Sequence, residues 1–537
     1  MNSSNLSRKL SWRSSSSSEE SSILSTSSST SGTSTSETRS TIPSPLPLEV
    51  IEEDFIGAEI QITASTSGVV PDDTFTVTEA VNSLGFGKFQ IILSFVTGLC
   101  WMSDSMEMMV LSILSPALHC EWGIDQMGQA FLTTVVFIGM MGSAMFWGKV
   151  SDTYGRKTAL ILAAGFMSFY GFLSSLSPSY TWLLFLRSCV GFNIGCVPQA
   201  VTLFAEFLPT KQRGKCVVLL DCFWALGACL TVVLAAWIMP STGNWRLFLA
   251  LTSVPPIIFV VLALIWLPES ARYNAAIGKT DKALKTLQKI ASDNGVQMIR
   301  GRLIVDDVHL NSYEVRGRFS DLLKSDLRMT SIILWLIWMT GSFVYYGIVF
   351  MTTELFETPD IVSLCRSTNT QEVICSAQCK ELDRMDYTHL LWISLAEFPG
   401  IMITIFLVER FERKNTLALE FFLLTASLCL LFRCSGDRTY ITGVLFFVRG
   451  IGSGVFQAAY LYTPEVYPTI LRSVGLGTCS GMARFGAMLT PYVAQVLVKK
   501  YYISAISIYV TVAAMATIGS LFLPAEKRGK ELVRNEH

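Results

Sequence analysis

The chain has 537 residues, of which 51% are hydrophobic and 15% are charged, and its formal net charge is −1. A net charge near zero offers no basic surface of the kind that nucleic-acid-binding proteins use, so we expect no nucleic-acid partner. The hydrophobic residues form long blocks separated by short charged loops, which is typical of a membrane protein and not of several soluble domains.

Both ends of the chain are expected to be tails. Residues 1–70 contain the run "SWRSSSSSEESSILSTSSSTSGTSTSETRS" and too few apolar residues to fold. We therefore expect a disordered, serine-rich cytoplasmic tail at 1–70 and a shorter cytoplasmic tail at 524–537.

Twelve apolar blocks are long enough to cross a bilayer, which requires about 20 residues per helix. The expected spans lie near 88–115, 128–148, 158–176, 181–204, 216–239, 246–267, 330–353, 387–408, 416–433, 439–462, 473–497 and 503–523. They divide into an N-terminal half at 71–267 and a C-terminal half at 330–523. Most lysines and arginines lie in tails and loops that are cytoplasmic if both termini are inside, in agreement with the positive-inside rule.

The long loop 268–329 separates the two halves and is expected on the cytoplasmic side. It contains "TDKALKTLQKIASDNG", in which Thr280 can cap a helix whose apolar residues share one face. The residues on this face are Ala283, Leu284, Leu287 and Ile290. We expect a short helix packed under the bundle and not a separate domain.

The two halves repeat each other in sequence. "AEFLPTKQRG" (Ala205–Gly214) returns as "PEVYPTILRS" (Pro464–Ser473), and "DTYGRK" (Asp152–Lys157) returns as "ERFERK" (Glu409–Lys414). Two similar halves imply a pseudo-twofold axis along the membrane normal with a cavity between them. A channel or a receptor needs no such symmetry, whereas an alternating-access carrier uses it.

Two glycines recur in the same way. Gly191 and Gly195 return as Gly450 and Gly454. Because small residues let membrane helices approach closely, these glycines are expected to be packing contacts and not a phosphate-binding loop.

Charged residues at the repeated inner ends of the spans are expected to close the cytoplasmic side. Opposite charges there can form a cluster that separates on opening, because exposed ion pairs contribute only ~0–1 kcal/mol each. The expected gate residues are Asp152, Arg156, Glu206 and Arg213 in the first half and Glu409, Arg413, Glu465 and Arg472 in the second. Alternatively the basic residues only determine topology, which leaves the paired acids without an explanation.

Several motifs resemble those of known transporters. "GKVSDTYGRK" (Gly148–Lys157) resembles the loop motif of the major facilitator superfamily, and "LPESARY" (Leu267–Tyr273) resembles the sugar-porter signature, with Ala271 where a proline is usual. "LAEFPG" and "GTCSGMARFGAMLTPY" are more similar to organic cation and anion transporters. From "DDTFTVTEAVNSLGFGKFQ" onward the chain resembles the synaptic vesicle 2-related family. The resemblance implies an all-α membrane protein of the major facilitator fold, with twelve transmembrane helices in two pseudo-symmetric six-helix halves.

Ionisable residues inside the spans are the first functional candidates, because a charge at the bilayer centre costs at least ~2.5 kcal/mol. Asp104 and Glu107 lie three residues apart in "WMSDSMEMMVLSIL", on one face of a helix. Spans one, four, seven and ten line the cavity in the implied fold, so both acids are expected to face Arg187. We expect Asp104 to be a proton-coupling carboxylate held by Arg187, with Glu107 tuning it or touching the substrate. The alternative is an Asp104–Arg187 salt bridge that only fixes helix packing.

The resemblance to organic-ion carriers adds two more residues. Glu397 and Arg484 match positions that lie beside the cavity in those carriers, so they are expected to contribute to substrate or proton coupling. Asp221 and Arg449 also lie within spans. A purely structural role for Asp221 stays open.

The cysteines of the outer loops are expected to be oxidised. The disulfide candidates are Cys120, Cys365, Cys375 and Cys379, and Cys434 falls in an outer loop as well. Two disulfides can connect the loop after span seven, but the sequence does not fix which cysteines pair.

These observations predict a secondary active transporter of a small, charged organic solute that works by alternating access and uses protons. The expected partners are the solute, membrane lipid and protons, and the expected state is a monomer with no cofactor and no metal. We expect a vesicle membrane or the plasma membrane as its location. No nucleophile–base pair or metal-ligand cluster indicates an enzyme. The alternative is a transporter-fold protein that acts as a receptor or vesicle-trafficking component without transport.

Overall fold

The computed structural model describes residues 74–304, 318–358, 362, 365, 382–468 and 470–524. The chain divides into two units, Met1–Gly68 and Val69–His537, and every described residue belongs to the second unit. The tail expected at 1–70 and residues 525–537 therefore lie outside the described residues.

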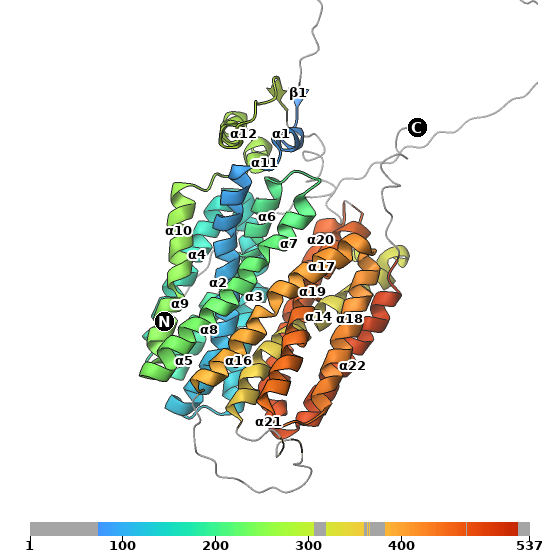
Figure 1. Cartoon of the computed structure of the whole chain (residues 1–537). Coiled ribbons are helices and arrows are strands. Elements are labelled where there is room, and N and C mark those ends of the chain that lie inside the picture. Colours follow the sequence, from blue (N-terminus) through green and yellow to red (C-terminus); the bar gives the residue numbers. More distant parts are fainter. Residues whose placement is uncertain are drawn as a thin grey trace, which may run out of the picture. The chain divides into compact units, whose positions relative to one another are not determined.

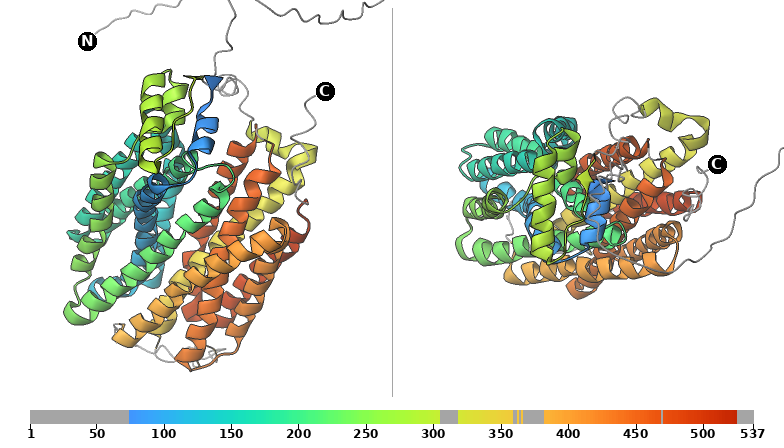
Figure 2. Two further views of the ribbon diagram at one scale, coloured as in Figure 1. Left: turned by 45° about the horizontal axis from the view of Figure 1, so that its top comes forward. Right: turned by 90° about the horizontal axis from the view of Figure 1, so that it is seen from above.

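The second unit is a bundle of long helices in two halves (Figures 1 and 2). The first half contains α2 (Lys88–Trp122), α3 (Gln126–Tyr154), α4 (Arg156–Ser175), α5 (Tyr180–Ile194), α6 (Pro198–Glu206), α7 (Arg213–Leu220), α8 (Cys222–Thr242), α9 (Trp245–Thr252) and α10 (Val254–Ile265). The second half contains α14 (Ser325–Glu357), α16 (Arg384–Leu395), α17 (Glu397–Arg410), α18 (Arg413–Cys429), η3 (Leu430–Phe432), α19 (Arg438–Val466), α20 (Arg472–Pro491), η4 (Tyr492–Leu497), α21 (Val498–Lys500) and α22 (Tyr502–Leu521).

The membrane-spanning character of these helices follows from their length and composition. Among the described residues, ten helical segments are long and apolar enough to cross a membrane, and the pair α1 (Val77–Leu84) and α2, bent by 108°, gives an eleventh. The segment from α20 to α21 takes the remaining place in the bundle and is less apolar, because it contains Arg484 and several glycines. The structure confirms the expected all-α membrane fold.

Proline lies at two of the breaks within the spans. Three residues separate the end of α5 from α6, which begins at Pro198. α20 changes into the π-helical turn η4 after Pro491. A proline has no backbone N–H and so interrupts the helical hydrogen bonds. A further break lies at Asp221, between α7 and α8. The breaks at Pro198 and Asp221 matter for function because both residues line the central cavity.

The repeated glycines hold equivalent helix contacts in the two halves. A Cβ atom on Gly191 of α5 would lie 2.2 Å from the carbonyl oxygen of Val136 on α3, and a Cβ atom on Gly450 of α19 would lie 2.8 Å from the carbonyl oxygen of Ala396, directly before α17. Gly195 and Gly454 face hydroxyl side chains of α3 and α17 at similarly short range. The internal repeat therefore encodes the same close packing twice, as the sequence predicts.

Short elements cover one end of the bundle, which we call the α12 end (Figure 1). They are α1, α11 (Ala271–Ala276), α12 (Thr280–Asn294) and a two-stranded parallel sheet of β1 (Thr74–Phe75) and β2 (Arg302–Leu303); η2 (Phe319–Leu323) precedes α14. The expected helix begins at Thr280, but Thr280 does not cap it, because the preceding Lys279 occupies the cap position without a side-chain hydrogen bond. Its buried face contains Ala283, Leu287 and Ile290.

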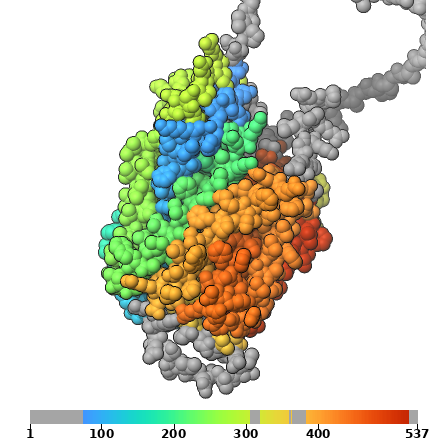
Figure 3. Space-filling model, in the orientation of Figure 1, coloured from blue at the N-terminus to red at the C-terminus, as the bar shows by residue number. Residues whose placement is uncertain are grey.

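The halves contact each other along the pairs α3–α20, α8–α16 and α2–α14. Figure 3 shows α7 and α8 (green) against α16 and α17 (orange) on one face of the unit. Large apolar side chains such as Met145, Trp237 and Phe406 are exposed on the outside of the bundle, which suits a surface in contact with lipid.

Candidate functional site

A cavity of about 110 Å³ lies between the two halves. Its walls come from α2, α3, α6 and α8 of the first half and from α14, α19 and α20 of the second. The charged or aromatic lining residues are Trp101, Asp104, Phe137, Asp221, Trp224, Trp338, Tyr345, Tyr346, Phe456, Tyr460 and Arg484. The lining thus combines two carboxylates, one guanidinium and eight aromatic rings, and both halves contribute to it.

Asp104 and Arg484 bring opposite charges to this cavity. Asp104 is only 5% exposed, and its Oδ1 atom has no hydrogen-bond partner among the described residues. Arg484 on α20 acts on Asp104 electrostatically across the cavity. The sequence analysis placed both residues at the site, and the structure brings them together.

Glu107 and Arg187 form a buried ion pair away from the cavity. The guanidinium of Arg187, which is 1% exposed, donates to the Oε2 atom of Glu107. This corrects the expected pairing of Arg187 with Asp104. Positions 104 and 107 differ by about 60° around the helix axis, so one carboxylate reaches the cavity while the other faces α5 inside the first half.

Asp221 is held in the cavity by an indole. The Nε1 atom of Trp101 donates to Oδ1 of Asp221 at 2.9 Å, and the ring of Trp101 lies 5.4 Å from that of Trp224. No cation among the described residues lies within ion-pair distance of Asp221. Asp221 therefore presents a buried carboxylate, oriented by Trp101, to the cavity.

A chain of hydrogen bonds runs from the cavity wall into the second half. Trp224 Nε1 donates to the hydroxyl of Tyr345 at 2.7 Å, and this hydroxyl donates to Oε1 of Glu397 at 2.7 Å. The same oxygen accepts from Nε of Arg449 at 2.8 Å. Glu397 is thus not a lining residue but the centre of a buried ion pair, and Tyr345 connects it to the first half.

Ion pairs gather at the α12 end, where the gate was expected. Arg156 lies 3.6 Å from Asp152 and 2.8 Å from Glu206 in the first half, and Arg413 pairs with Glu465 in the second. The structure does not bring Arg213 or Arg472 into an ion pair with a described acid. Arg213 donates instead to the carbonyl oxygen of Leu208 at 3.2 Å, because that carbonyl lies in the turn directly before α7.

One ion pair at the α12 end joins the two halves. Lys215 Nζ lies 2.5 Å from Oε1 of Glu409, and the two side chains are 63% and 49% exposed. The other gate pairs lie within one half each. Residues that were expected to form a gate therefore make ion pairs within each half and, among the described residues, one exposed ion pair between the halves.

The two motifs with transporter resemblance touch each other at the α12 end. The backbone N–H of Lys157 donates to Oε1 of Glu269 at 3.1 Å, and Tyr273 donates to the carbonyl oxygen of Thr153 at 2.7 Å. Gly155 between them has φ +100°, and a Cβ atom there would lie 2.2 Å from Oε2 of Glu269. These contacts explain why a glycine precedes Arg156, whereas Glu412 at φ −67° suffices in the second copy.

At the opposite end, which we call the disulfide end, hydroxyl groups join the halves. Ser112 donates to the carbonyl oxygen of Val349 at 2.9 Å and lies 2.9 Å from the hydroxyl of Thr353. Gln495 Nε2 donates to the hydroxyl of Ser115 at 3.3 Å. These bonds are buried, unlike the connection at the α12 end.

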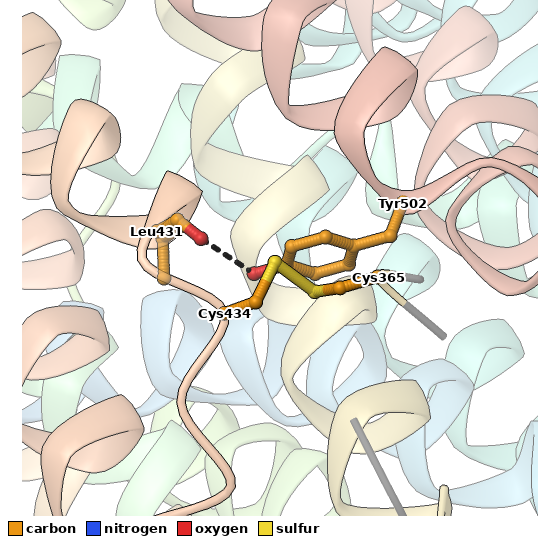
Figure 4. Close-up of a disulfide and its surroundings, with 4 residues drawn as sticks. All are labelled: Cys365, Leu431, Cys434 and Tyr502. Atoms are coloured by element: carbon orange, nitrogen blue, oxygen red, sulfur yellow. Dashed lines mark hydrogen bonds between the residues drawn. A yellow bond between two sulfur atoms is a disulfide. The ribbon is translucent and has the colours of Figure 1, made fainter. Parts of the chain in front are cut away.

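A disulfide joins Cys365 and Cys434 at this end (Figure 4). It ties the segment after α14 to the segment after η3, near the hydrogen bond from Tyr502 to the carbonyl oxygen of Leu431 at 3.1 Å. Its second cysteine lies outside the four candidates. Cys120 is also disulfide-bonded, whereas the candidates Cys375 and Cys379 lie outside the described residues.

Comparison with known proteins decides the family. Residues 86–377 match the family "Sugar (and other) transporter". The chain belongs to this transporter family. It is 49% identical to the synaptic vesicle 2-related protein of Bos taurus over 466 residues, covering 87% of this chain and 84% of that protein. It is 50% identical to the putative transporter svop-1 of Caenorhabditis elegans, covering 86% and 87%, and 34% identical to the putative transporter SVOPL of Mus musculus, covering 86% and 93%.

A solved structure agrees with the fold. The partially occluded, inward-open xylose transporter XylE of E. coli superposes with a TM-score of 0.63 at 15% identity, covering 81% of this chain and 100% of that chain. This confirms the major facilitator fold with its two halves, and the family and fold are those of transporters and not of enzymes.

Sequence reasoning missed three residues at the cavity and between the halves. Trp101 and Trp224 line the cavity, and Lys215 joins the halves. The signal for Trp224 is present in "DCFWALG", because Asp221 and Trp224 lie three residues apart on one helical face. No comparable signal exists for Lys215, since its partner lies in the other half.

Proposed function

We propose that the protein is a secondary active transporter of a small, charged organic solute, which it exposes alternately to the two sides of the membrane. Membership of the transporter family supports the coarser part of this assignment. The observation that carries the finer part is Asp104: a buried carboxylate with an unpartnered oxygen, in a cavity that both halves line, opposite Arg484.

Asp104 is the proposed site of a coupling proton. Burial disfavours the ionised form of a carboxyl group, while a nearby guanidinium favours it. These opposing influences suit a group that takes up a proton when the cavity faces one side and releases it on the other. Arg484, and through Tyr345 the Glu397–Arg449 pair, are the proposed partners in this coupling.

The two ends of the bundle are the proposed gates. Hydroxyl hydrogen bonds close the disulfide end, and the Lys215–Glu409 pair is the connection between the halves at the α12 end. We assign the α12 end to the cytoplasm, in line with the charge distribution of the loops. The names of the relatives favour a vesicle membrane as the location.

The test starts from a bound solute. Purified protein is screened against a metabolite library by thermal shift, because a ligand of the native state raises the melting temperature. Uptake of a hit is then measured in proteoliposomes with an imposed pH gradient. The variants are Asp104→Asn and, as a matched control, Asp125→Asn, since Asp125 only caps α3 and asparagine caps equally well.

Wild type and the control are expected to accumulate the solute when a pH gradient is present. Asp104→Asn is expected to lose this accumulation but to keep part of the exchange of solute for solute, because its cavity retains its shape. Undiminished, pH-driven accumulation by folded Asp104→Asn would exclude Asp104 as the proton site. A bound solute that never crosses the membrane would exclude transport.

A further inference from the structure

The cavity holds more negative than positive charge. Asp104 and Asp221 both line it and are 5% and 8% exposed, whereas Arg484 is the one cation among its described lining residues. Arg484 acts on Asp104. The donors that act on Asp221 are the indole N–H of Trp101 and the side-chain amide of Gln457, and both are neutral. A ligand that balances the cavity therefore brings positive charge to Asp221.

The rings around Asp221 have already used their polar hydrogens. Trp101 donates its N–H to Asp221, Trp224 donates its N–H to the hydroxyl of Tyr345, and this hydroxyl donates to Glu397. What these three side chains still offer a ligand is the π face of each ring. An anion needs donors at this position, whereas a cation is attracted by carboxylates and by ring faces.

The rings pack against one another as part of the cavity lining. The centroids of Trp101 and Trp224 are 5.4 Å apart with the ring planes at 52°, and those of Trp224 and Tyr345 are 6.5 Å apart at 52°. Phe456 packs edge-on against Tyr345 at 5.8 Å. Rings at these separations and angles pack directly against one another, and the surface that they leave uncovered lines the cavity beside Asp221.

We propose that the solute is a monovalent organic cation, a protonated amine, whose ammonium group binds Asp221 in the cavity, beside the rings of Trp101 and Trp224. This assignment rests on the proposed transport function and deepens it. Asp221 and the rings recognise the solute, while Asp104 and Arg484 serve the proton.

The test uses ligands that share one shape and differ in charge. Tryptamine, tryptophol and indole-3-acetate form one such series, and phenethylamine, 2-phenylethanol and phenylacetate form a second. Each is titrated against purified full-length protein by thermal shift and calorimetry. The variants are Asp221→Asn, Trp224→Ala and the control Asp125→Asn.

At least one amine is expected to bind ten times more tightly than its matched alcohol and acid. Asp221→Asn and Trp224→Ala should each weaken amine binding at least tenfold, and the control should bind as wild type does. Trp224→Ala keeps the carboxylate, so it tests the contribution of the rings even if Asp221→Asn does not fold.

Other outcomes overturn the inference in identifiable ways. If alcohols or acids bind as tightly as the amines in both series, or if amine binding is unchanged in both variants, the cationic site is wrong and transport of another solute stands. If amines bind as expected but do not cross proteoliposome membranes, the site stands and the transport function falls.

Discussion

Removing the negative charge of Glu107 is expected to destabilise the protein far more than removing that of Asp104. Arg187 is 1% exposed and pairs with Glu107 within the first half. Breaking a buried ion pair by removing one partner costs ~3–5 kcal/mol, because the other charge stays buried and unpaired. This is more than a hundredfold change in the ratio of folded to unfolded protein.

Asp104 presents the opposite case. Its Oδ1 atom has no partner among the described residues, so Asp104→Asn removes a buried charge without breaking an ion pair. We expect this variant to be at least as stable as wild type. The pair Glu107→Gln and Asp104→Asn is well matched, because each replaces a carboxylate by its amide on the same helix.

The assay is the fraction of purified protein that stays monodisperse in size-exclusion chromatography after heating. Glu107→Gln should lose the folded peak at a lower temperature, and Glu107→Gln with Arg187→Met should recover part of the loss, because neither charge is then left alone. If Asp104→Asn is less stable than Glu107→Gln, or the double variant is the least stable of all, the pairing described here is refuted.

Three further expectations follow from the packing and the two ends. Gly191→Ala should prevent stable folding, because its Cβ atom would lie 2.2 Å from a backbone oxygen. Gly142→Ala should leave folding unchanged, because no atom lies within 4 Å of its Cβ position. The yield of purified protein and its elution in size-exclusion chromatography distinguish the two variants. A reporter cysteine introduced at Ser453 should be labelled from the α12 end up to about fivefold faster in Lys215→Glu, because an exposed ion pair contributes ~1 kcal/mol. Adding Glu409→Lys should restore the original labelling rate. Equal labelling rates in all variants would exclude the proposed gate. Proteolytic fragments cut between the two cysteines of Figure 4 should stay linked until reduced, and fragments that separate without reductant would contradict the disulfide.

The sequence predicts the spans well because each span is a local property. Length and apolar content decide whether a segment such as α8 crosses a bilayer, and these can be counted without knowing the neighbours. Close packing at Gly191 and Gly450 is also predictable, because the internal repeat preserves it in both halves. The ends of the helices differ by several residues from the expected spans, since capping residues and not the bilayer set them.

The partners of the buried charges cannot be read in the same way. Asp104 and Glu107 look equivalent in sequence, and only the rotation of α2 in the bundle decides which of them meets Arg187. The link from Trp224 to Glu397 runs through Tyr345 of the other half, and a repeat within one chain contains no information on contacts between its copies. The helical scaffold is therefore predictable from this sequence, whereas the hydrogen bonds and ion pairs around the cavity are not.

Two threonine hydroxyls, those of Thr353 and Thr134, have an acceptor on their own helix. Thr353 donates to the carbonyl oxygen of Phe350 on its own helix at 2.9 Å, and Thr134 donates to Ala130 on its own helix at 2.9 Å while reaching Met488 of the other half at 3.4 Å. If the halves part in the proposed transport cycle, each of these threonines keeps a hydrogen bond within its own helix. Neither hydroxyl is then buried without an acceptor, which would cost about 1–3 kcal/mol per group. Opening of this end therefore costs these two threonines little, whereas Ser112, whose partners Val349 and Thr353 both lie in the other half, gives up its contacts and so contributes more to the resistance to opening.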